Sequence, residues 1–229
     1  MLSAINKQQS TDKIRIAKRI ALELEANPGS VVNLGVGIPT LIQNYLSPDS
    51  EVFLQSENGV LGMGPTPPEE EKDMDLISAS KHPITLGTGA SIFSNSDSFV
   101  MIRGGHIDIA VLGALQVSGT GEIANWAVPG QDILGVGGAM DLVASAKKII
   151  IAITQVSKDN TPKIVKELTY PTSGIRTAEM IVTEKAVFRI KDDQLILEEV
   201  SETSSVEEVR RLTGAEFIVS ENLKKMEDY

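Results

Sequence analysis

Apolar residues along the chain follow two spacings, and the spacing changes near residue 27. Over residues 11–26 they recur on one face at helical spacing, which predicts an amphipathic helix that begins at Ser10 or Thr11. The Asn27-Pro28-Gly29 segment ends this helix. Short apolar runs follow and predict strands at 30–34, 51–55, 83–86, 107–112 and 148–154.

Helical patterns lie between several of these strands. They cover residues 39–46, 96–103 and 139–146, whereas residues 62–75 are rich in glycine, proline and charge and predict a surface loop. Towards the C-terminus the pattern predicts strands at 177–183, 186–190 and 194–200, and then a helix at 206–213. Alternating strands and helices predict an α/β fold with a mainly parallel sheet flanked by helices. Without a linker or repeat, residues 1–229 are expected to form a single domain.

Composition excludes several kinds of chemistry. The chain has no cysteine, which removes thiolate nucleophiles and iron–sulfur clusters, and its two histidines offer little for a metal site. The formal net charge of -10 opposes binding to nucleic acid. No run is long and apolar enough for a membrane span or a signal peptide, so we expect a soluble, cytoplasmic protein with no membrane partner.

The Gly35-Val36-Gly37 turn, between a predicted strand and a predicted helix, is one candidate binding motif. It resembles the start of a dinucleotide-binding fingerprint, with Glu57 about 20 residues on as the ribose-binding acid. The third glycine of that fingerprint is replaced by Thr40. A nicotinamide-dependent dehydrogenase is therefore one alternative, and a glycine turn with no ligand is another.

Glu57 is the stronger candidate for chemistry. It follows a predicted strand and precedes Asn58-Gly59, where open α/β sheets bind ligands. A carboxylate is ionised at neutral pH, so it can attack an acyl thioester without a general base. The developing oxyanion needs N–H donors, which the glycine-rich backbone at Gly137 and Gly138 could supply.

Six motifs, in this order, resemble the beta subunit of family I CoA-transferases, or the C-terminal half of the fused chains in that family. The family includes the 3-oxoacid CoA-transferases. The motifs are Asn33-Leu34-Gly35-Val36-Gly37-Ile38-Pro39, Ser56-Glu57-Asn58-Gly59-Val60-Leu61-Gly62, Met101-Ile102-Arg103-Gly104-Gly105-His106-Ile107-Asp108, Leu112-Gly113-Ala114-Leu115-Gln116-Val117, Ala124-Asn125-Trp126 and Gly137-Gly138-Ala139-Met140-Asp141-Leu142-Val143.

The resemblance implies the CoA-transferase fold and a ping-pong reaction in which Glu57 becomes a glutamyl-CoA thioester. It further implies that Asn33 and Gly35 lie in the CoA and carbonyl region, and that Gly138, with Gly137 beside it, donates to the oxyanion. Coenzyme A is then a substrate, with no permanently bound cofactor and no metal. An alpha subunit would complete a hetero-oligomer.

Three segments depart from the family pattern and leave the acyl donor and acceptor open. They are Ala127, Thr154-Gln155-Val156 and residues 170–175. A non-catalytic CoA-binding subunit is a further alternative, against which the intact Ser56-Glu57-Asn58-Gly59 motif argues.

Overall fold

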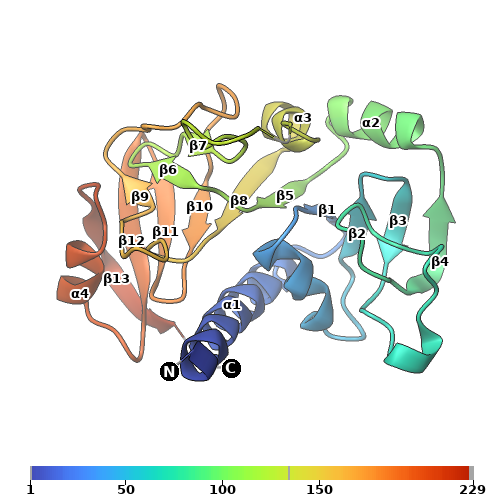
Figure 1. The fold of residues 1–229 in the computed structure, drawn as a ribbon, viewed down its shortest axis with the longest axis horizontal. Coiled ribbons are helices and arrows are strands. Elements are labelled where there is room, and N and C mark those ends of the chain that lie inside the picture. Colours follow the sequence, from blue (N-terminus) through green and yellow to red (C-terminus); the bar gives the residue numbers. More distant parts are fainter. Residues whose placement is uncertain (1, 134, 227–229) are drawn as a thin grey trace.

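A computed structural model describes residues 2–133 and 135–226 (Figure 1). The helices are α1 (Leu2–Glu25), α2 (Asn95–Arg103), α3 (Ala139–Ser145) and α4 (Val206–Arg211), with 3₁₀ helices at Ile38–Asn44 and Glu69–Glu71. The strands are β1 (Val31–Leu34), β2 (Phe53–Ser56), β3 (Val60–Met63), β4 (Leu86–Ile92), β5 (Ile109–Leu112), β6 (Gln116–Ser118), β7 (Ile123–Ala124), β8 (Lys148–Ala152), β9 (Ile164–Val165), β10 (Met180–Val182), β11 (Ala186–Lys191), β12 (Gln194–Ser201) and β13 (Ile218–Met226).

Most described strands form one ten-stranded sheet in the order β13-β12-β11-β10-β8-β5-β1-β2-β3-β4. Its centre, β10-β8-β5-β1-β2, is parallel, while β2-β3-β4 on one side and β10-β11-β12 on the other are antiparallel. The sheet is therefore mainly parallel where the predicted buried strands lie. A separate three-stranded sheet, β7-β6-β9, packs beside it.

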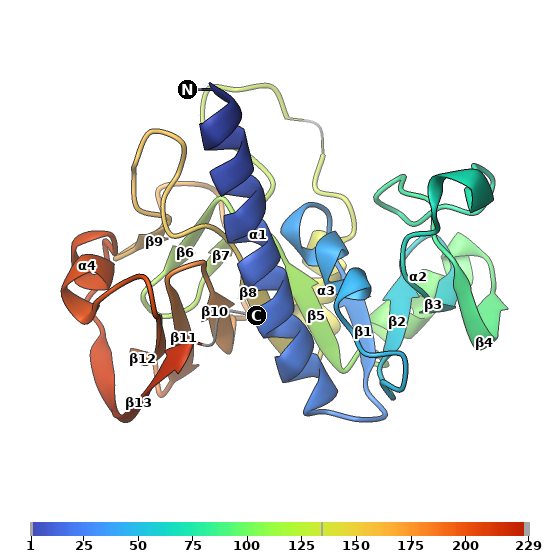
Figure 2. The same ribbon diagram turned by 90° about the horizontal axis from the view of Figure 1, so that it is seen from below.

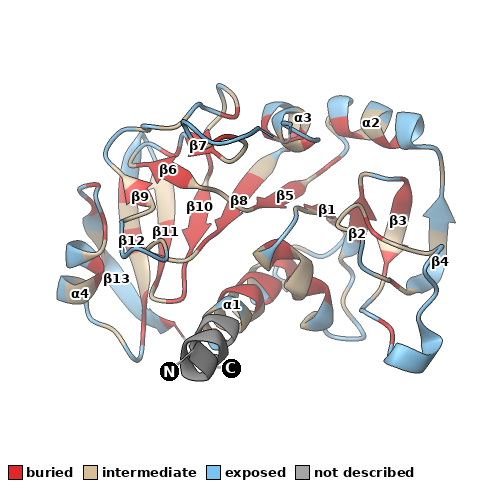
Figure 3. Ribbon diagram, in the orientation of Figure 1, coloured by how far each residue is buried: buried red, intermediate tan, exposed pale blue. Residues whose placement is uncertain are grey.

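Helices cover both faces of the parallel centre (Figures 1 and 2). Alternate residues of β5 and β8 belong to two different hydrophobic clusters: Val111 and Ile150 pack with the α1 face, and Leu112 and Ile151 pack on the opposite side with α3. This two-sided burial explains why these strands consist of almost continuous apolar residues (Figure 3).

The predicted strands of the parallel centre are confirmed. The strand β3, whose end lies within the predicted 62–75 loop, and the separate sheet β7-β6-β9 were not predicted, and the other errors fall at the edges of the large sheet. Residues 83–86 are not a buried strand: β4 begins at Leu86 and is a largely exposed edge strand. The helix predicted after Pro39 is a 3₁₀ helix, and α1 begins at Leu2, before the predicted cap. The strand β13 was not predicted, because its Ser-Glu-Asn-Leu-Lys-Lys run lacks an apolar pattern. Among the described residues, no helix has the length and apolarity to cross a membrane.

A partly buried charge cluster anchors α1 to the sheet. Glu23 Oε1 accepts hydrogen bonds from Lys148 Nζ and Arg189 Nη2, both at 2.8 Å, and these donors lie on β8 and β11. Burial acts to raise the pKa of Glu23, but the hydrogen bonds and charges of its two partners lower it from 4.5 to about 2. Ionised Glu23 therefore stabilises the docked helix.

We predict that Glu23→Gln lowers the free energy of unfolding by about 2–3 kcal/mol at pH 7. Because the pKa of Glu23 is depressed in the folded state, the difference from wild type shrinks as the pH falls from 4.5 towards 2. Urea denaturation over this range measures it. Glu51→Gln, at an exposed carboxylate, serves as the control; equal effects of the two substitutions would contradict the role of Glu23.

Candidate active site

The turn between β2 and β3 carries Glu57. Gly59 closes this turn by donating its N–H to the carbonyl oxygen of Ser56 at 3.0 Å. Gly59 has a φ of +120°, and a Cβ there would lie 2.1 Å from the carbonyl oxygen of Phe93. Position 59 thus requires glycine both for its conformation and for close approach to the neighbouring chain.

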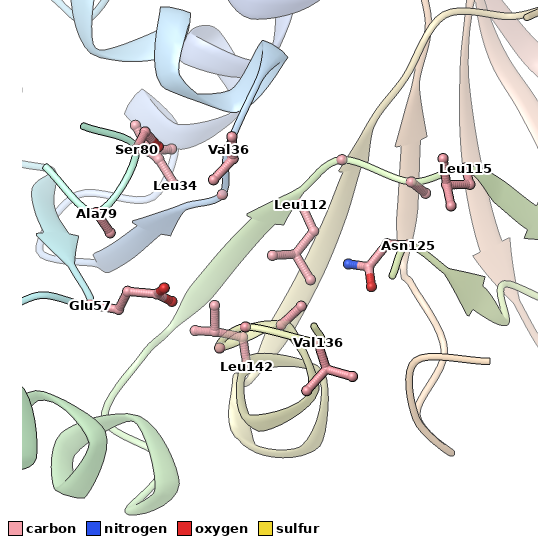
Figure 4. Close-up of a pocket in the computed structure, with 16 residues that line it drawn as sticks. Leu34, Val36, Glu57, Ala79, Ser80, Leu112, Leu115, Asn125, Val136 and Leu142 are labelled. Carbon is pink, nitrogen blue, oxygen red and sulfur yellow. The ribbon is translucent and has the colours of Figure 1, made fainter. Parts of the chain in front are cut away.

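Hydrogen bonds from surrounding segments fix the backbone on both sides of Glu57. Asn95 Nδ2 donates to the carbonyl oxygen of Glu57 at 3.0 Å, and the N–H of Ala79 donates to Ser56 Oγ at 2.9 Å. Asn58 Nδ2 donates to the carbonyl oxygen of Ile77 at 2.7 Å. The turn is therefore held from α2 and from the 77–79 segment, while the carboxylate of Glu57 points into a cavity (Figure 4).

This cavity has a volume of about 370 Å³ and mostly apolar walls. It lies at the carboxyl ends of β1 and β5, from which the chain leaves towards opposite sides of the sheet. Such a switch point is where open α/β sheets bind ligands. The lining residues are Leu34, Gly35, Val36, Glu57, Ala79, Ser80, Leu112, Gly113, Ala114, Leu115, Asn125, Val136, Gly137, Gly138, Ala139 and Leu142.

The glycine pair before α3 lies directly against Glu57. Gly138 precedes the first residue of α3, and a Cβ at this position would lie 2.3 Å from Glu57 Oε2 and 3.2 Å from Phe99 Cζ. Gly137 has a φ of +57° and also lines the cavity. The absence of a side chain at position 138 therefore makes the space that the carboxylate occupies.

The Glu57 carboxylate is destabilised in its charged form. Burial is the main cause that raises its pKa, and the negative charge of Asp141 on α3 raises it further. Asp141 itself pairs with Arg103 on α2, with 2.8 Å between Asp141 Oδ1 and Arg103 Nε. A partly desolvated carboxylate is poorly hydrated, which favours its reaction with an electrophile.

Asn33 and Gly35, predicted in the same region, occupy different surroundings. The N–H of Gly35 donates to the carbonyl oxygen of Val111 at 2.8 Å, and Gly35 lines the cavity. Asn33 is buried within β1 and is not a lining residue: its Nδ2 donates to Gln55 Oε1 at 2.5 Å, and Gln55 Nε2 donates to Ser98 Oγ at 2.7 Å. This chain of amides links β1, β2 and α2 behind Glu57.

Sequence reasoning gave no role to Asn125 and Asp141. Asn125 lines the cavity and Asp141 acts on the charge of Glu57, although both lie within motifs singled out in the sequence. Residue type and spacing do not show which motif positions face a cavity. Within the described part of the chain, no group of three or more histidine, aspartate or glutamate side chains could hold a metal ion.

Comparison of the sequence with known proteins gives one consistent result. Residues 13–212 match the family described as Coenzyme A transferase. One subunit of the 3-oxoadipate CoA-transferase of Acinetobacter baylyi is 45% identical over 89% of this chain and 94% of its own length. The human mitochondrial succinyl-CoA:3-ketoacid coenzyme A transferase 2 is 48% identical over 94% of this chain, but the match spans only 42% of that protein.

Solved structures share the fold at lower sequence identity. The acyl-CoA transferase YdiF of Escherichia coli O157:H7, solved as a thioester complex with CoA, has a TM-score of 0.71 at 22% identity, covering 94% of this chain and 43% of that one. The decarboxylase AibA/AibB has a TM-score of 0.66 at 19% identity, covering 94% and 88%. The fold therefore hosts more than one chemistry. The family match and the high coverage of the Acinetobacter relative establish that this chain belongs to the coenzyme A transferase family.

Proposed function

We propose that this chain is the beta subunit of a two-subunit enzyme that transfers CoA between a short-chain acyl-CoA and a carboxylic acid of the 3-oxo class. The observation that carries the proposal is the partly buried carboxylate of Glu57, which faces the cavity against the backbone of Gly138. The relatives named for 3-oxoadipate and 3-ketoacids support the substrate class.

In the first step, a carboxylate oxygen of Glu57 attacks the thioester carbonyl carbon of the acyl-CoA. The carbon–sulfur bond breaks, CoA leaves as a thiolate, and an acyl-glutamyl anhydride remains. The thiolate then attacks the side-chain carbonyl carbon of Glu57 and expels the acyl group as a free carboxylate. This leaves a glutamyl-CoA thioester, and the acceptor acid reverses both steps.

Backbone groups beside Glu57 suit the charge that develops in each attack. The N–H of Gly138, with Gly137 beside it, is proposed to donate to the oxyanion, because no side chain separates this backbone from the carboxylate. Gly35 is proposed to form part of the wall that the reacting carbonyl contacts. Asn33 is proposed to act from behind the site, since its amide holds Gln55 two residues before Glu57.

A second subunit is part of the proposal. The cavity volume of about 370 Å³ is near the lower end of the range for ligand pockets, about 300–1,000 Å³. The cavity therefore suits the acyl group and thioester of an acyl-CoA, and the rest of the CoA molecule would be bound by another wall. An alpha-type subunit is the proposed source of that wall, because the bacterial relatives are named as single subunits of their enzymes. CoA enters as a substrate, and a cytoplasmic location remains a prediction.

The sequence also allows two other functions, a nicotinamide-dependent dehydrogenase and a non-catalytic CoA-binding subunit. A dinucleotide site gains no support, since the Gly35-Val36-Gly37 turn leads into a 3₁₀ helix and Glu57 faces a different glycine pair. A non-catalytic CoA-binding subunit is separated from the proposal by substitution of Glu57.

Removal of the nucleophile should abolish transfer. We predict that Glu57→Gln and Glu57→Asp, each co-expressed with an alpha-type subunit, lose several orders of magnitude in kcat, since one lacks the charge and the other retracts the carboxylate by one methylene. Initial-rate assays measure the loss, and size-exclusion chromatography verifies assembly. Normal turnover of an assembled Glu57→Gln enzyme would contradict a nucleophilic Glu57.

A methyl group at position 138 should displace the nucleophile. We predict that Gly138→Ala lowers kcat by about a hundredfold, because the added Cβ would lie 2.3 Å from Glu57 Oε2 and push the carboxylate out of line. The backbone of Gly138 has a φ of -82°, which alanine adopts freely, so the thermal unfolding midpoint should change little. A loss of stability that matches the loss of activity would indicate a purely structural glycine.

The fall of kcat/KM at acidic pH, the acidic limb of the pH profile, should depend on the charge of Asp141. Because burial and the charge of Asp141 raise the pKa of Glu57, wild-type kcat/KM falls as the pH drops through this raised value and Glu57 becomes protonated. Asp141→Asn removes one of the two causes, so we predict that the limb moves to lower pH. Asp49→Asn, at an exposed site, is the control. An unmoved limb in Asp141→Asn would show that another group sets it.

A further inference from the structure

Asn125 lies across the cavity from Glu57 and has no part in the steps above. It follows β7 directly and lines the same cavity. Figure 4 places Glu57 and Asn125 on opposite sides, with Leu112 between them. Any group that reacts at Glu57 and extends across the cavity therefore approaches Asn125.

The side-chain amide of Asn125 is held in one orientation by Ser173. Ser173 is fully buried, and its Oγ accepts a hydrogen bond from the backbone N–H of Asn125 at 2.9 Å. The same hydroxyl donates to Asn125 Oδ1 at 2.6 Å. The amide oxygen is thus engaged by Ser173, and the amide nitrogen is turned into the cavity (Figure 4).

Two further hydrogen bonds fix the same segment. Trp126 Nε1 donates to the carbonyl oxygen of Thr172 at 3.0 Å, and the N–H of Ser173 donates to the carbonyl oxygen of Ile123 at 2.7 Å. These bonds tie residues 123–126 to residues 172–173 on both sides of Asn125. Little reorganisation is then needed for Nδ2 to present its hydrogens to a ligand.

The surroundings of this nitrogen indicate the kind of group it would bind. Nearby walls of the cavity are apolar, formed by Leu112, Leu115, Val136 and Leu142. A donor among apolar walls needs an acceptor, because an unpaired polar group in such a place is costly. A neutral acceptor is favoured over a charged one, because a charge costs more to transfer from water to apolar surroundings. Carbonyl oxygens have this chemistry, and an acyl-CoA can offer one in its acyl chain or in its pantetheine arm.

We infer that Asn125 is a specificity-determining residue, whose Nδ2 donates to the 3-oxo oxygen of the acyl group while Glu57 attacks the thioester carbonyl. This inference rests on the proposed function. Two carbons separate the attacked carbonyl from the 3-oxo oxygen, so the acyl chain extends away from Glu57 towards the opposite wall. Ser173 acts as a positioning residue that keeps the donor, rather than the amide oxygen, turned towards the substrate.

The test compares two thioesters that differ at the third carbon of the acyl group. Acetoacetyl-CoA carries a carbonyl there and butyryl-CoA carries a methylene, and each is assayed with wild-type enzyme and with Asn125→Leu, both assembled with the alpha-type subunit. We expect Asn125→Leu to lower the ratio of kcat/KM for acetoacetyl-CoA to that for butyryl-CoA by about tenfold. Ser173→Ala should lower the ratio by a smaller factor, and Ser173→Thr, which keeps the hydroxyl, should restore part of it.

Each other result overturns the inference. An equal loss for both thioesters would place the hydrogen bond on the pantetheine arm of CoA, and an unchanged ratio with unchanged rates would mean that Asn125 makes no contact with substrate. If the wild-type enzyme transfers CoA but the ratio is the same in Asn125→Leu, the inference is wrong and the proposed function is unaffected. Failure of the wild-type enzyme to use either thioester would remove both.

Discussion

The site depends on one steric constraint: the carboxylate of Glu57 occupies the space where a side chain at position 138 would lie. The 2.3 Å separation between Glu57 Oε2 and the Cβ that glycine lacks couples two elements that are far apart in the sequence. The β2–β3 turn must present the carboxylate, and α3 must begin with a residue without a side chain. The position of the carboxylate and the absence of a side chain at position 138 are therefore two sides of one steric fit.

The rest of the structure brings these two elements together. Parallel strands β1, β5 and β8 carry their carboxyl ends to one edge, and the two hydrophobic clusters fix α1 on one face of the sheet and α3 on the other. The Asp141–Arg103 pair joins α3 to α2, and the amides of Asn33 and Gln55 join β1 and β2 to Ser98 of α2. Glu57 is thus positioned by neighbours that themselves make hydrogen bonds or ion pairs.

The sequence predicted the centre of the fold better than its edges. Residues 107–112 and 148–154 are almost continuously apolar because both faces of β5 and β8 are buried, which is the pattern of a central parallel strand. Strand β13 pairs with β12 mainly through backbone hydrogen bonds and exposes charged side chains, so its residues carry no apolar signal. The strand predicted at 83–86 is misplaced because the apolar run ends where β4 begins, and β4 itself is a largely exposed edge strand.

The same division applies to the site. Glu57, Gly137 and Gly138 could be predicted because a motif carries them, and the structure brings all three to one cavity. The electrostatic role of Asp141 and the fixed amide of Asn125 depend on contacts between segments distant in sequence, which residue spacing does not encode. Membership of a motif does not by itself place a residue in the cavity: Asn33 belongs to a motif but lies in a buried hydrogen-bond network behind the site.

The central claim, that Glu57 carries CoA covalently, is tested most directly by trapping the intermediate. The assembled enzyme is incubated with acyl-CoA and no acceptor acid, digested, and analysed by peptide mass spectrometry. The account predicts CoA attached through a thioester to the peptide that contains Glu57, and its loss when an acceptor carboxylate is added. A modification on another residue, or transfer without any covalent adduct, would contradict it.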